Sequence, residues 1–319
     1  MTQNLQAQMN WNHHLSVVIP VYYGQESLAE LVARLKDSLS KITENYEIIL
    51  VDDDSPDHSW KIMESIANAD QRVRVFRLSR NFGQHYAISC GLANASGEWT
   101  VVMDCDLQDR PEEIIKLYQA ANKQELDIVL ARRFDRKDKS SKKFFSIIFY
   151  RVLYYLTGLK QDESVANFGI YHHKVITAVL SMPETICYFP SMVQWVGFRS
   201  GKIDVQHSPR INGTSSYNFK RLLRLATDIM LAYSDKPLRI VVKTGIMISS
   251  VSILVCFWYY CKWLSGEVIV LGYASLIISI WLLSGIIIAT LGVIGLYVGK
   301  IFEGVKNRPS FIVAESIND

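Results

Sequence analysis

The chain has 319 residues, of which 49% are hydrophobic and 20% are charged, and its formal net charge is +3. The hydrophobic content excludes a disordered or fibrous protein, and the balance of 34 basic and 31 acidic residues argues against a nucleic-acid-binding protein. The length allows one large domain or two modest ones. Residues 1–14 form a polar N-terminal tail without the apolar core of a signal peptide, so none is expected.

After this tail, the chain predicts an alternation of strands and helices. Apolar runs rich in β-branched residues predict five strands, at 15–20, 47–51, 73–78, 99–103 and 126–131. Helical spacing of apolar residues lies between the first strands, at 26–39 and 59–69. This alternation indicates an α/β fold with a mostly parallel sheet, Rossmann-like in its layering, which binds ligands outside the carboxyl ends of the strands.

Two long segments without charged residues follow near the end of the chain, Thr244–Cys261 and Val268–Gly299. Each is long enough to cross a bilayer as a helix, so we expect a transmembrane hairpin with spans at 240–262 and 272–299. Basic residues flank the outer ends of the hairpin, namely Lys236, Arg239 and Lys243 before it and Lys300, Lys306 and Arg308 after it. By the positive-inside rule, the N-terminal domain and both termini are expected in the cytoplasm, including a C-terminal tail at 300–319.

The segments directly after the predicted strands are acidic and polar rather than glycine-rich. They read PVYYGQES, VDDDSPD, SRNFGQH and MDCDLQDRPEE, and neither a dinucleotide-binding fingerprint nor a P-loop occurs. Asp104 and Asp106 leave a strand at positions i and i+2, with Gln108 and Asp109 close behind. Two such carboxylates can bind one hard cation that also binds phosphate oxygens, so Mg²⁺ or Mn²⁺ is expected. Histidine and cysteine show no zinc-ligand spacing.

These segments, in this order, resemble glycosyltransferase family 2 and, more narrowly, its polyprenyl-phosphate sugar transferases. The matching stretches are SVVIPVYYGQESL, IILVDDDSPDHS, LSRNFGQHYAI, MDCDLQDRPEEI, SPRINGTSSYNF, the two apolar segments and GLYVGKIFEGVKNRPSFIV. The resemblance covers nearly the whole chain. It implies a GT-A catalytic domain at 15–217 that transfers a sugar, with inversion, from a nucleotide sugar to a polyprenyl phosphate such as undecaprenyl phosphate. The stretch 80–84 looks more like the UDP-sugar branch.

The resemblance also implies roles for individual residues. The donor is expected to bind Pro20, Tyr22, Glu26, Asp53, Arg80, Gly83, Gln84 and Asp104. The cation is expected on Asp104, Asp106 and Gln108, and Asp106 or Asp109 could act as a catalytic residue that orients the acceptor. The acceptor phosphate is expected to contact Arg132, Arg133, Arg210 and Ser215, since arginine can donate two hydrogen bonds to one phosphate.

Two basic segments with aromatic residues, 139–156 and 218–239, predict amphipathic helices and a linker at the membrane surface, where a lipid-linked phosphate lies. The alternative is that these helices pack on the core of the domain. The resemblance implies a bacterial-type inner membrane and a role in cell-envelope glycans such as O-antigen or lipopolysaccharide. It also suggests a homo-oligomer, which the G-x-x-x-G of Gly295 and Gly299 supports only weakly.

Three positions depart from the family pattern: Asn167 stands where many relatives have aspartate, Ser216 where they have lysine, and Asp54 where they have glycine. These departures leave the donor and the acceptor geometry open. Two other classes therefore remain, a transferase of the same fold that acts on a carbohydrate hydroxyl and a non-catalytic membrane scaffold. The identity of the sugar and the pathway that uses it are not in the sequence.

Overall fold

A computed structural model describes residues 13–133, 165–182, 188–206, 236–265, 272–306 and 308–319. Within them the strands are β1 (His13–Val21), β2 (Tyr46–Asp52), β3 (Val73–Leu78), β4 (Gly97–Val102), β5 (Ile128–Arg133), β6 (Val165–His172), β7 (Ser200–Val205) and β8 (Val313–Ile317). The helices are α1 (Leu28–Ser40), α2 (Ser59–Ala69), α3 (Gln84–Ala93), the 3₁₀ turn Pro111–Glu113, α4 (Ile114–Lys123), α6 (His173–Leu180), α7 (Phe189–Trp195), α9 (Lys236–Leu264) and α10 (Tyr273–Val305).

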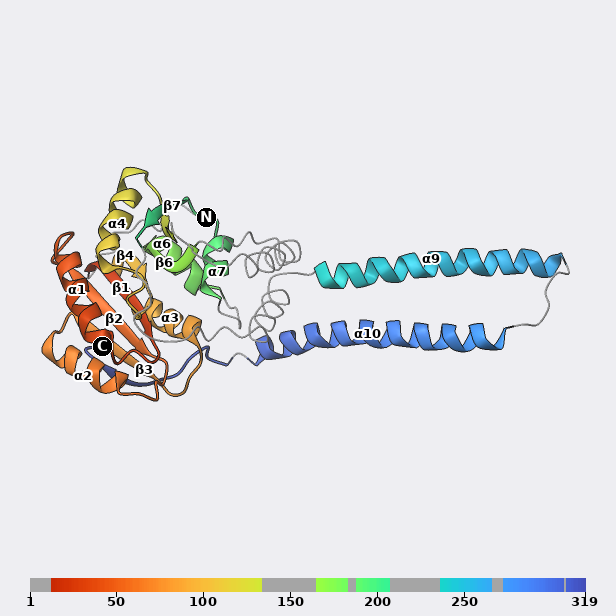
Figure 1. The fold of residues 1–319 in the computed structure, drawn as a ribbon, viewed down its shortest axis with the longest axis horizontal. Helices are drawn as coiled ribbons and strands as arrows, with labels where there is room; N and C mark the ends of the chain where they lie inside the picture. The colour runs from red at the N-terminus through yellow and green to blue at the C-terminus, as the bar shows by residue number, and fades with distance from the viewer. Residues whose placement is uncertain (1–12, 134–164, 183–187, 207–235, 266–271, 307) are drawn as a thin grey trace. The chain divides into compact units, whose positions relative to one another are not determined.

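The eight strands form one sheet in the order β7-β5-β6-β4-β1-β2-β3-β8 (Figure 1). The pairs β1–β2, β1–β4, β2–β3 and β5–β7 are parallel, whereas β6 and β8 run antiparallel to their neighbours. The five strands predicted from the sequence are all present, with ends that differ by at most two residues. The structure thus confirms the α/β fold with a mostly parallel sheet. The helix α4 connects β4 to β5 along the chain, but these two strands are not neighbours in the sheet, because β6 lies between them.

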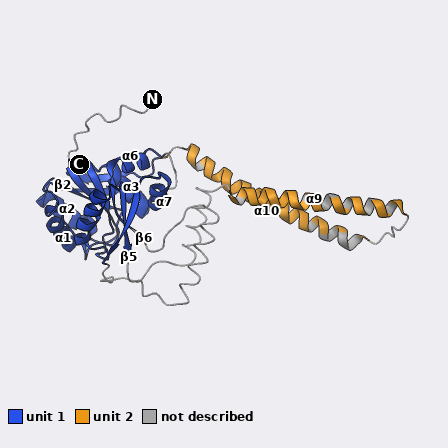
Figure 2. Cartoon of the chain, turned by 90° about the horizontal axis from the view of Figure 1, so that it is seen from above, with its two compact units in different colours: residues 1–145, 159–216, 309–319 blue, residues 146–158, 217–308 orange. Residues whose placement is uncertain are grey.

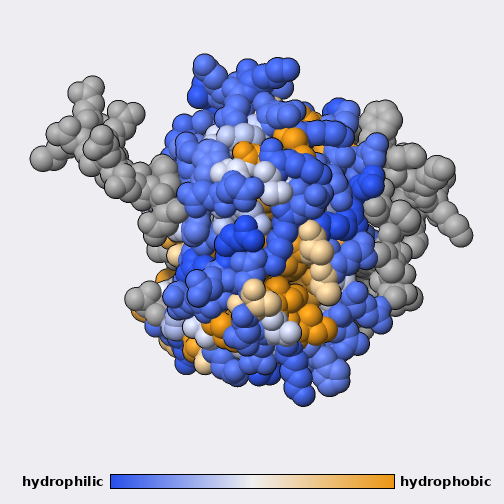
Figure 3. Space-filling model, turned by 90° about the vertical axis from the view of Figure 1, so that its left-hand side faces the viewer, coloured by the Kyte–Doolittle hydropathy of each residue, from blue (hydrophilic) through white to orange (hydrophobic). Residues whose placement is uncertain are grey.

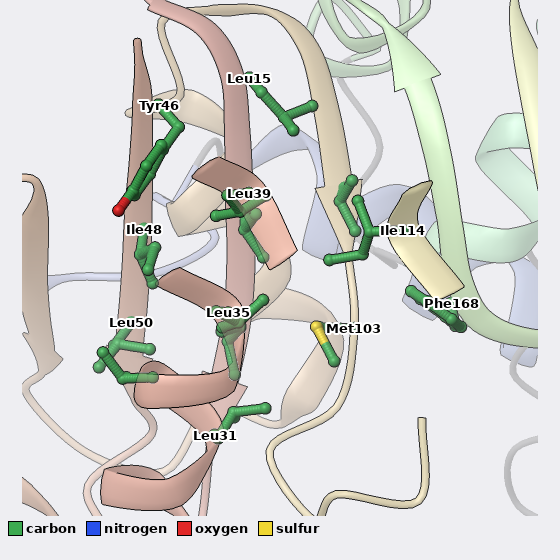
Figure 4. Close-up of a cluster of buried hydrophobic side chains, with 14 of the residues drawn as sticks. Leu15, Leu31, Leu35, Leu39, Tyr46, Ile48, Leu50, Met103, Ile114 and Phe168 are labelled. Atoms are coloured by element: carbon green, nitrogen blue, oxygen red, sulfur yellow. The ribbon is translucent and has the colours of Figure 1, made fainter. Parts of the chain in front are cut away.

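The core lies on both faces of the sheet, because successive side chains of a strand point to opposite faces. On one face, Leu15 of β1 belongs to the same buried cluster as Leu31 and Leu35 of α1, and α2 and α4 cover the rest of that cluster (Figure 4). On the other face, Val18 of β1 packs under α3, α6 and α7. Each fully buried leucine or valine contributes roughly 1.5–3 kcal/mol, so the two layers hold the strand ends rigidly in place.

The strand at the far end of the chain completes the sheet. β8 pairs antiparallel with β3, and its flanking residues bind the same region. Arg74 donates from Nη2 to Asp319 Oδ1 at 3.1 Å. The Asn318 side chain donates to the carbonyl of Ala67 in α2 at 2.8 Å and to that of Val73 at the start of β3 at 2.9 Å. The predicted tail at 300–319 therefore divides between the end of α10 and a strand of the eight-stranded sheet.

The chain forms two compact units (Figure 2). The first contains the sheet and includes residues 309–319, and the second contains α9 and α10, which lie side by side. Large apolar side chains such as Phe257 and Leu291 are exposed along these two helices. By contrast, hydrophilic side chains dominate the face of the molecule in Figure 3, with smaller apolar patches between them.

Among the described residues, one segment is long and apolar enough to cross a membrane by its length and composition. This segment is Leu282–Phe302 of α10. Its mean hydropathy is 2.2, and none of its residues is buried inside the protein. The helix α9 has 29 residues and covers the first predicted span. The predicted amphipathic segment 139–156 and most of 218–239 lie outside the described residues.

The close approach of α3 to β1 provides a test of this packing. A Cβ atom at Gly91 of α3 would lie 2.3 Å from Cγ1 of Val18, which is buried in β1. We expect Gly91→Ala to destabilise the protein by about 1–3 kcal/mol, because overpacking outweighs the roughly 0.5–1 kcal/mol that alanine gains over glycine in a helix. Scanning calorimetry of the full chain in detergent measures this as a lower melting temperature.

Two variants serve as controls for this prediction. Ala93→Gly changes an exposed position of the same helix, and the double variant Gly91→Ala with Val18→Ala gives the new methyl group space. Ala93→Gly should cost at most about 1 kcal/mol, and the double variant should be less destabilised than the sum of its single changes. A Gly91→Ala protein that melts at the wild-type temperature would contradict the packing described here.

Candidate active site

The carboxyl ends of β1, β2, β3 and β4 meet at one edge of the sheet, because these strands are parallel. The chain turns sharply as it leaves three of them. Tyr23, Asp54 and Leu107 have φ angles of 57°, 55° and 59°, in the left-handed region that residues with a Cβ rarely adopt. Aspartate tolerates this conformation better than most residues, which explains how Asp54 can stand where relatives have glycine.

Asp53 holds the loop after β3 against the end of β2. Its Oδ1 accepts a hydrogen bond from the backbone N–H of Phe82 at 2.7 Å, and its Oδ2 accepts one from Gly83 at 2.9 Å. Burial raises the pKa of the Asp53 carboxyl, and these two backbone hydrogen bonds act in the opposite direction. Gly83 has a φ of 109°, so a side chain there would be strained. The loop that leads into α3 is therefore fixed at its last two residues.

The first residue of α3 reaches the end of β4. Gln84 donates from Nε2 to Asp104 Oδ1 at 2.7 Å. The sequence predicts Gln84 as a donor-binding residue, and in the structure its side chain contacts Asp104, a predicted cation ligand. No local sequence signal indicates this contact, because it joins residues 20 positions apart on different loops.

The segment after β4 presents oxygen atoms in a compact turn. Asp106 Oδ1 accepts a hydrogen bond from the backbone N–H of Gln108 at 3.1 Å, and between them Leu107 is buried in the core. Asp104, Asp106 and Gln108 are half-buried, whereas the side chain of Asp109 is only 2% exposed. The turn therefore brings the three predicted cation ligands near the surface and turns Asp109 inward.

This donor set fits a hard divalent cation. Within the described residues, no group of three or more histidine, cysteine or acidic side chains forms a closed metal site. Mg²⁺ typically binds one or two protein carboxylates together with water and substrate phosphates, and Asp104 with Asp106 matches that pattern. Burial raises the pKa of Cys105, between them, to about 12, so its thiol stays protonated and is a poor ligand at neutral pH.

The loop after β1 lies against the loops of β2 and β4. Ser27 donates from Oγ to the carbonyl of Cys105 at 2.6 Å, and the backbone N–H of Tyr23 donates to Ser55 Oγ at 2.7 Å. Tyr22 is 47% exposed and packs edge-to-face on Tyr23, with ring centroids 4.8 Å apart. Sequence reasoning missed Ser27 and Ser55, which connect the loops without standing in a recognisable motif.

The other predicted donor residues lie near this edge in different environments. Pro20 is buried within β1, and Glu26 is exposed in the turn before α1. Arg80 is exposed, with its guanidinium 4.0 Å from the ring centroid of Phe82. Burial lowers the pKa of His85 to about 4, so this imidazole is neutral at physiological pH; its ring centroid lies 4.7 Å from that of Tyr188.

The predicted acceptor residues are only partly described. Arg132 forms a bidentate ion pair with Asp204 of β7, with Nε–Oδ1 and Nη2–Oδ2 distances of 2.5 and 3.0 Å. Arg133 ends β5, and Arg210 and Ser215 lie outside the described residues. Because β6 separates β5 from β4 and runs opposite to both, Arg132 stands at the same sheet edge as Asp104, two strands away.

Asn167 also belongs to this edge. β6 pairs antiparallel with β4, with Gly169 opposite Val102, so the start of β6 lies level with the turn that follows β4. Asn167, two residues before Gly169, is therefore at the height of Asp104. The position where many relatives have aspartate is thus a site position, and here it carries a neutral amide.

Comparisons with known proteins show what this chain is similar to. The family model described as "Glycosyl transferase family 2" matches residues 16–178. An undecaprenyl-phosphate 4-deoxy-4-formamido-L-arabinose transferase of Proteus mirabilis is 31% identical over 311 residues, which cover 95% of this chain and 94% of that protein. A bactoprenol glucosyl transferase from a prophage of Shigella flexneri is also 31% identical, over 306 residues that cover 95% of this chain and 98% of that protein.

Solved structures share the fold. Glucosyl-3-phosphoglycerate synthase from Mycobacterium tuberculosis, crystallised with Mn²⁺, UDP and phosphoglyceric acid, superposes with a TM-score of 0.51. The match covers 69% of this chain and 77% of that chain at 14% sequence identity. At this identity the similarity concerns the fold alone.

The acidic run after β2 gives a prediction about pH. Asp52 is fully buried, and burial raises the pKa of its carboxyl to about 6, although Ser55 N–H donates to Oδ1 at 3.2 Å and Arg77 Nε lies 3.7 Å from Oδ2. Because the folded pKa exceeds the unfolded value near 4, the group stabilises the fold at low pH. This contribution is lost as the pH rises from about 4 through about 6.

We therefore expect Asp52→Asn, which removes the buried charge and keeps the shape, to be more stable than wild type at pH 7.5 by about 1–2 kcal/mol. The difference should shrink towards pH 5, where the wild-type carboxyl takes up a proton. Melting temperatures of the full chain at pH 5, 6 and 7.5 measure it. A variant that is less stable at pH 7.5, or a difference that grows towards pH 5, would show that ionised Asp52 stabilises the fold.

Proposed function

The chain belongs to glycosyl transferase family 2, and from this membership we propose that it transfers a sugar from a nucleotide donor to a polyprenyl phosphate at a membrane. The two relatives described above match it over nearly their whole length, and their names include undecaprenyl phosphate and bactoprenol. The donor is proposed to be a UDP-sugar, because the stretch 80–84 resembles the UDP-sugar branch of the family.

One observation carries the proposal. Asp53, the loop that it holds, Gln84 and the pair Asp104 and Asp106 meet at a single edge of the sheet. This edge offers a polar surface beside the turn of Tyr22 for a nucleoside and a pair of carboxylates for the cation of a diphosphate. A nucleotide sugar has these two parts, and in α/β sheets such ligands bind at the carboxyl ends of the strands.

The reaction proposed here is a displacement at the sugar. An oxygen of the acceptor phosphate forms a bond to C1 of the sugar, the bond from C1 to the β-phosphate oxygen breaks, and the nucleoside diphosphate leaves with the bonding electrons. The configuration at C1 inverts. The acceptor phosphate is already an anion near neutral pH, so it needs no strong general base, which is compatible with Asn167 in place of an acid. A contact of Asp106 with the acceptor remains a proposal, and Asp109 would have to leave its buried position to make one.

Asp104 and Asp106, with Gln108 beside them, would hold Mg²⁺ or Mn²⁺. When bound, such an ion supplies positive charge next to the diphosphate, where negative charge grows as the bond breaks. The Mn²⁺ found with a protein of the same fold is consistent with this choice. The chain's own contribution is to fix the two carboxylates, through a short turn whose Leu107 is anchored in the core.

The acceptor phosphate is proposed to bind the arginines at the same edge. Arg132 stands level with the carboxylates and is held in a fixed orientation by Asp204. Its guanidinium is half-exposed, and the planar arrangement of N–H donors in arginine suits a phosphate. Arg133, Arg210 and Ser215 are proposed as further contacts on the strength of the family motif.

The connectivity of the sheet supports a two-span membrane hairpin. β3 and β8 pair in one sheet, so the chain between them must begin and end on the same side of any membrane that it crosses. The number of crossings is then even. If α10 spans the bilayer at Leu282–Phe302, a second span must precede it, and α9, with 29 residues or about 43 Å of helix, is long enough. The basic residues outside both helices favour a cytoplasmic catalytic domain.

An assay of sugar transfer tests the proposed activity. Purified full-length protein with undecaprenyl phosphate, Mn²⁺ and a panel of radiolabelled UDP- and GDP-sugars should move label from one donor into the organic phase. Asp106→Asn, which keeps the shape and removes the charge, should lower the rate roughly 10²–10³-fold, because it weakens binding of the cation that would stabilise the negative charge on the leaving diphosphate.

Asp37→Asn is the matched control, since it makes the same change at an exposed position of α1, outside the loops that follow the strands. It should leave the rate unchanged. Label that stays aqueous with every donor, although UDP binds, would argue for a carbohydrate hydroxyl as the acceptor. Failure to bind any nucleotide would favour a non-catalytic scaffold.

Cysteine labelling in intact cells tests the hairpin. In a background with the five native cysteines replaced, Ser265→Cys at the end of α9 should react with a membrane-impermeant maleimide added from outside. A cysteine placed at exposed Glu315 of β8 should react only after lysis. External reaction at both positions, or at neither, would contradict a two-span hairpin with a cytoplasmic domain.

A further inference from the structure

The contact between Gln84 and Asp104 is not explained by the stability of the fold. The amide lies 2.7 Å from the carboxylate, and Gln84 is exposed, where a hydrogen bond contributes little because water competes for both groups. An ionised carboxylate only accepts hydrogen bonds, so the Gln84 atom that faces Asp104 is the amide nitrogen Nε2. The main effect of this hydrogen bond is therefore to orient the carboxylate of Asp104.

Both partners of this contact start from fixed backbone. Gln84 follows Phe82 and Gly83, whose N–H groups are bound by Asp53, and it precedes His85, whose ring is packed against Tyr188. On the other side, the residue before Asp104 is the buried Met103, whose N–H donates to the carbonyl of Val18 at 3.2 Å. The Gln84 side chain therefore connects two rigid points.

We propose that Gln84 is a positioning residue that sets the rotation of the Asp104 carboxylate and thereby links the loop after β3 to the cation. With Oδ1 held by the amide, the plane of the carboxylate is defined, and Oδ2 is directed to one place. Groups that orient metal ligands in this way typically change metal affinity 10- to 100-fold when they are removed. The inference rests on the proposed function, because it assumes that Asp104 binds the cation of a nucleotide.

The link has a consequence for binding of the nucleotide. The loop 80–83 is proposed to contact the nucleoside, and it leads directly into Gln84, the residue that orients Asp104. Nucleotide and cation should then bind with positive coupling that passes in part through the Gln84 amide. Because coupling between two ligands is reciprocal, loss of this hydrogen bond should weaken the effect of Mn²⁺ on UDP and the effect of UDP on Mn²⁺ by the same factor.

The variant Gln84→Met tests the proposal, since methionine has nearly the same length and apolar stem but no N–H donor. Full-length protein in detergent is titrated with Mn²⁺, followed by the electron paramagnetic resonance signal of free Mn²⁺, with and without UDP. UDP binding is measured calorimetrically with Mn²⁺ and with EDTA. We expect Gln84→Met to weaken Mn²⁺ binding in the presence of UDP about 10- to 100-fold, with UDP affinity in EDTA and the melting temperature of the unliganded protein unchanged.

Gln119→Met makes the same change at an exposed position of α4 and should behave as wild type. Gln84→Asn, whose amide is one methylene too short to keep this geometry, should behave as Gln84→Met. Unchanged Mn²⁺ binding in Gln84→Met would overturn the positioning role and leave the proposed function intact. An equal loss of UDP affinity in EDTA would also overturn it, in favour of a direct contact with the nucleotide. Wild-type protein without any Mn²⁺-dependent UDP binding would overturn the proposed function itself, whatever Gln84 does.

Discussion

The buried carboxylate of Asp53 is the constraint on which the edge of the sheet depends. It stands at the end of β2, and its two oxygens bind the backbone N–H groups of Phe82 and Gly83. A carboxylate in this position lets a loop that would otherwise expose two backbone donors adopt one conformation, because charge-assisted hydrogen bonds are stronger than those to neutral acceptors. The start of α3, the direction of Gln84 and hence the surroundings of Asp104 all follow from that conformation.

The return of the chain to the sheet is the second constraint. β8 pairs with β3, and next to this pair the N–H of Ser79, which follows β3, donates to the carbonyl of Ile312, which precedes β8, at 2.9 Å. The same pairing requires an even number of membrane crossings between β7 and β8. A helix pair that emerges and returns would keep the catalytic edge and the lipid phosphate on one side of the bilayer, as transfer to a membrane-bound acceptor demands.

Local patterns were sufficient for much of the fold. Strands such as 73–78 and the helix 59–69 were predicted with their observed bounds, because alternating or helically spaced apolar residues are set by which face of an element is buried. The polar residues after each strand were also recognised, since parallel strands bring their carboxyl ends to one edge. Burial of Asp109 was not predicted, because it lies in an irregular turn, with Leu107 at positive φ, where no periodic pattern indicates which side chains are buried.

The sequence by itself determined the α/β class, the family, the acidic pair Asp104 and Asp106 and the two uncharged segments, because each is written in residues close together in the chain. Only the tertiary structure decided that Gln84 binds Asp104, that Arg132 pairs with Asp204 and that β8 joins the sheet beside β3. These contacts join residues from 20 to more than 200 positions apart. Their formation depends on strand order and register, which result from the packing of the whole sheet and leave no periodic signal in any one segment.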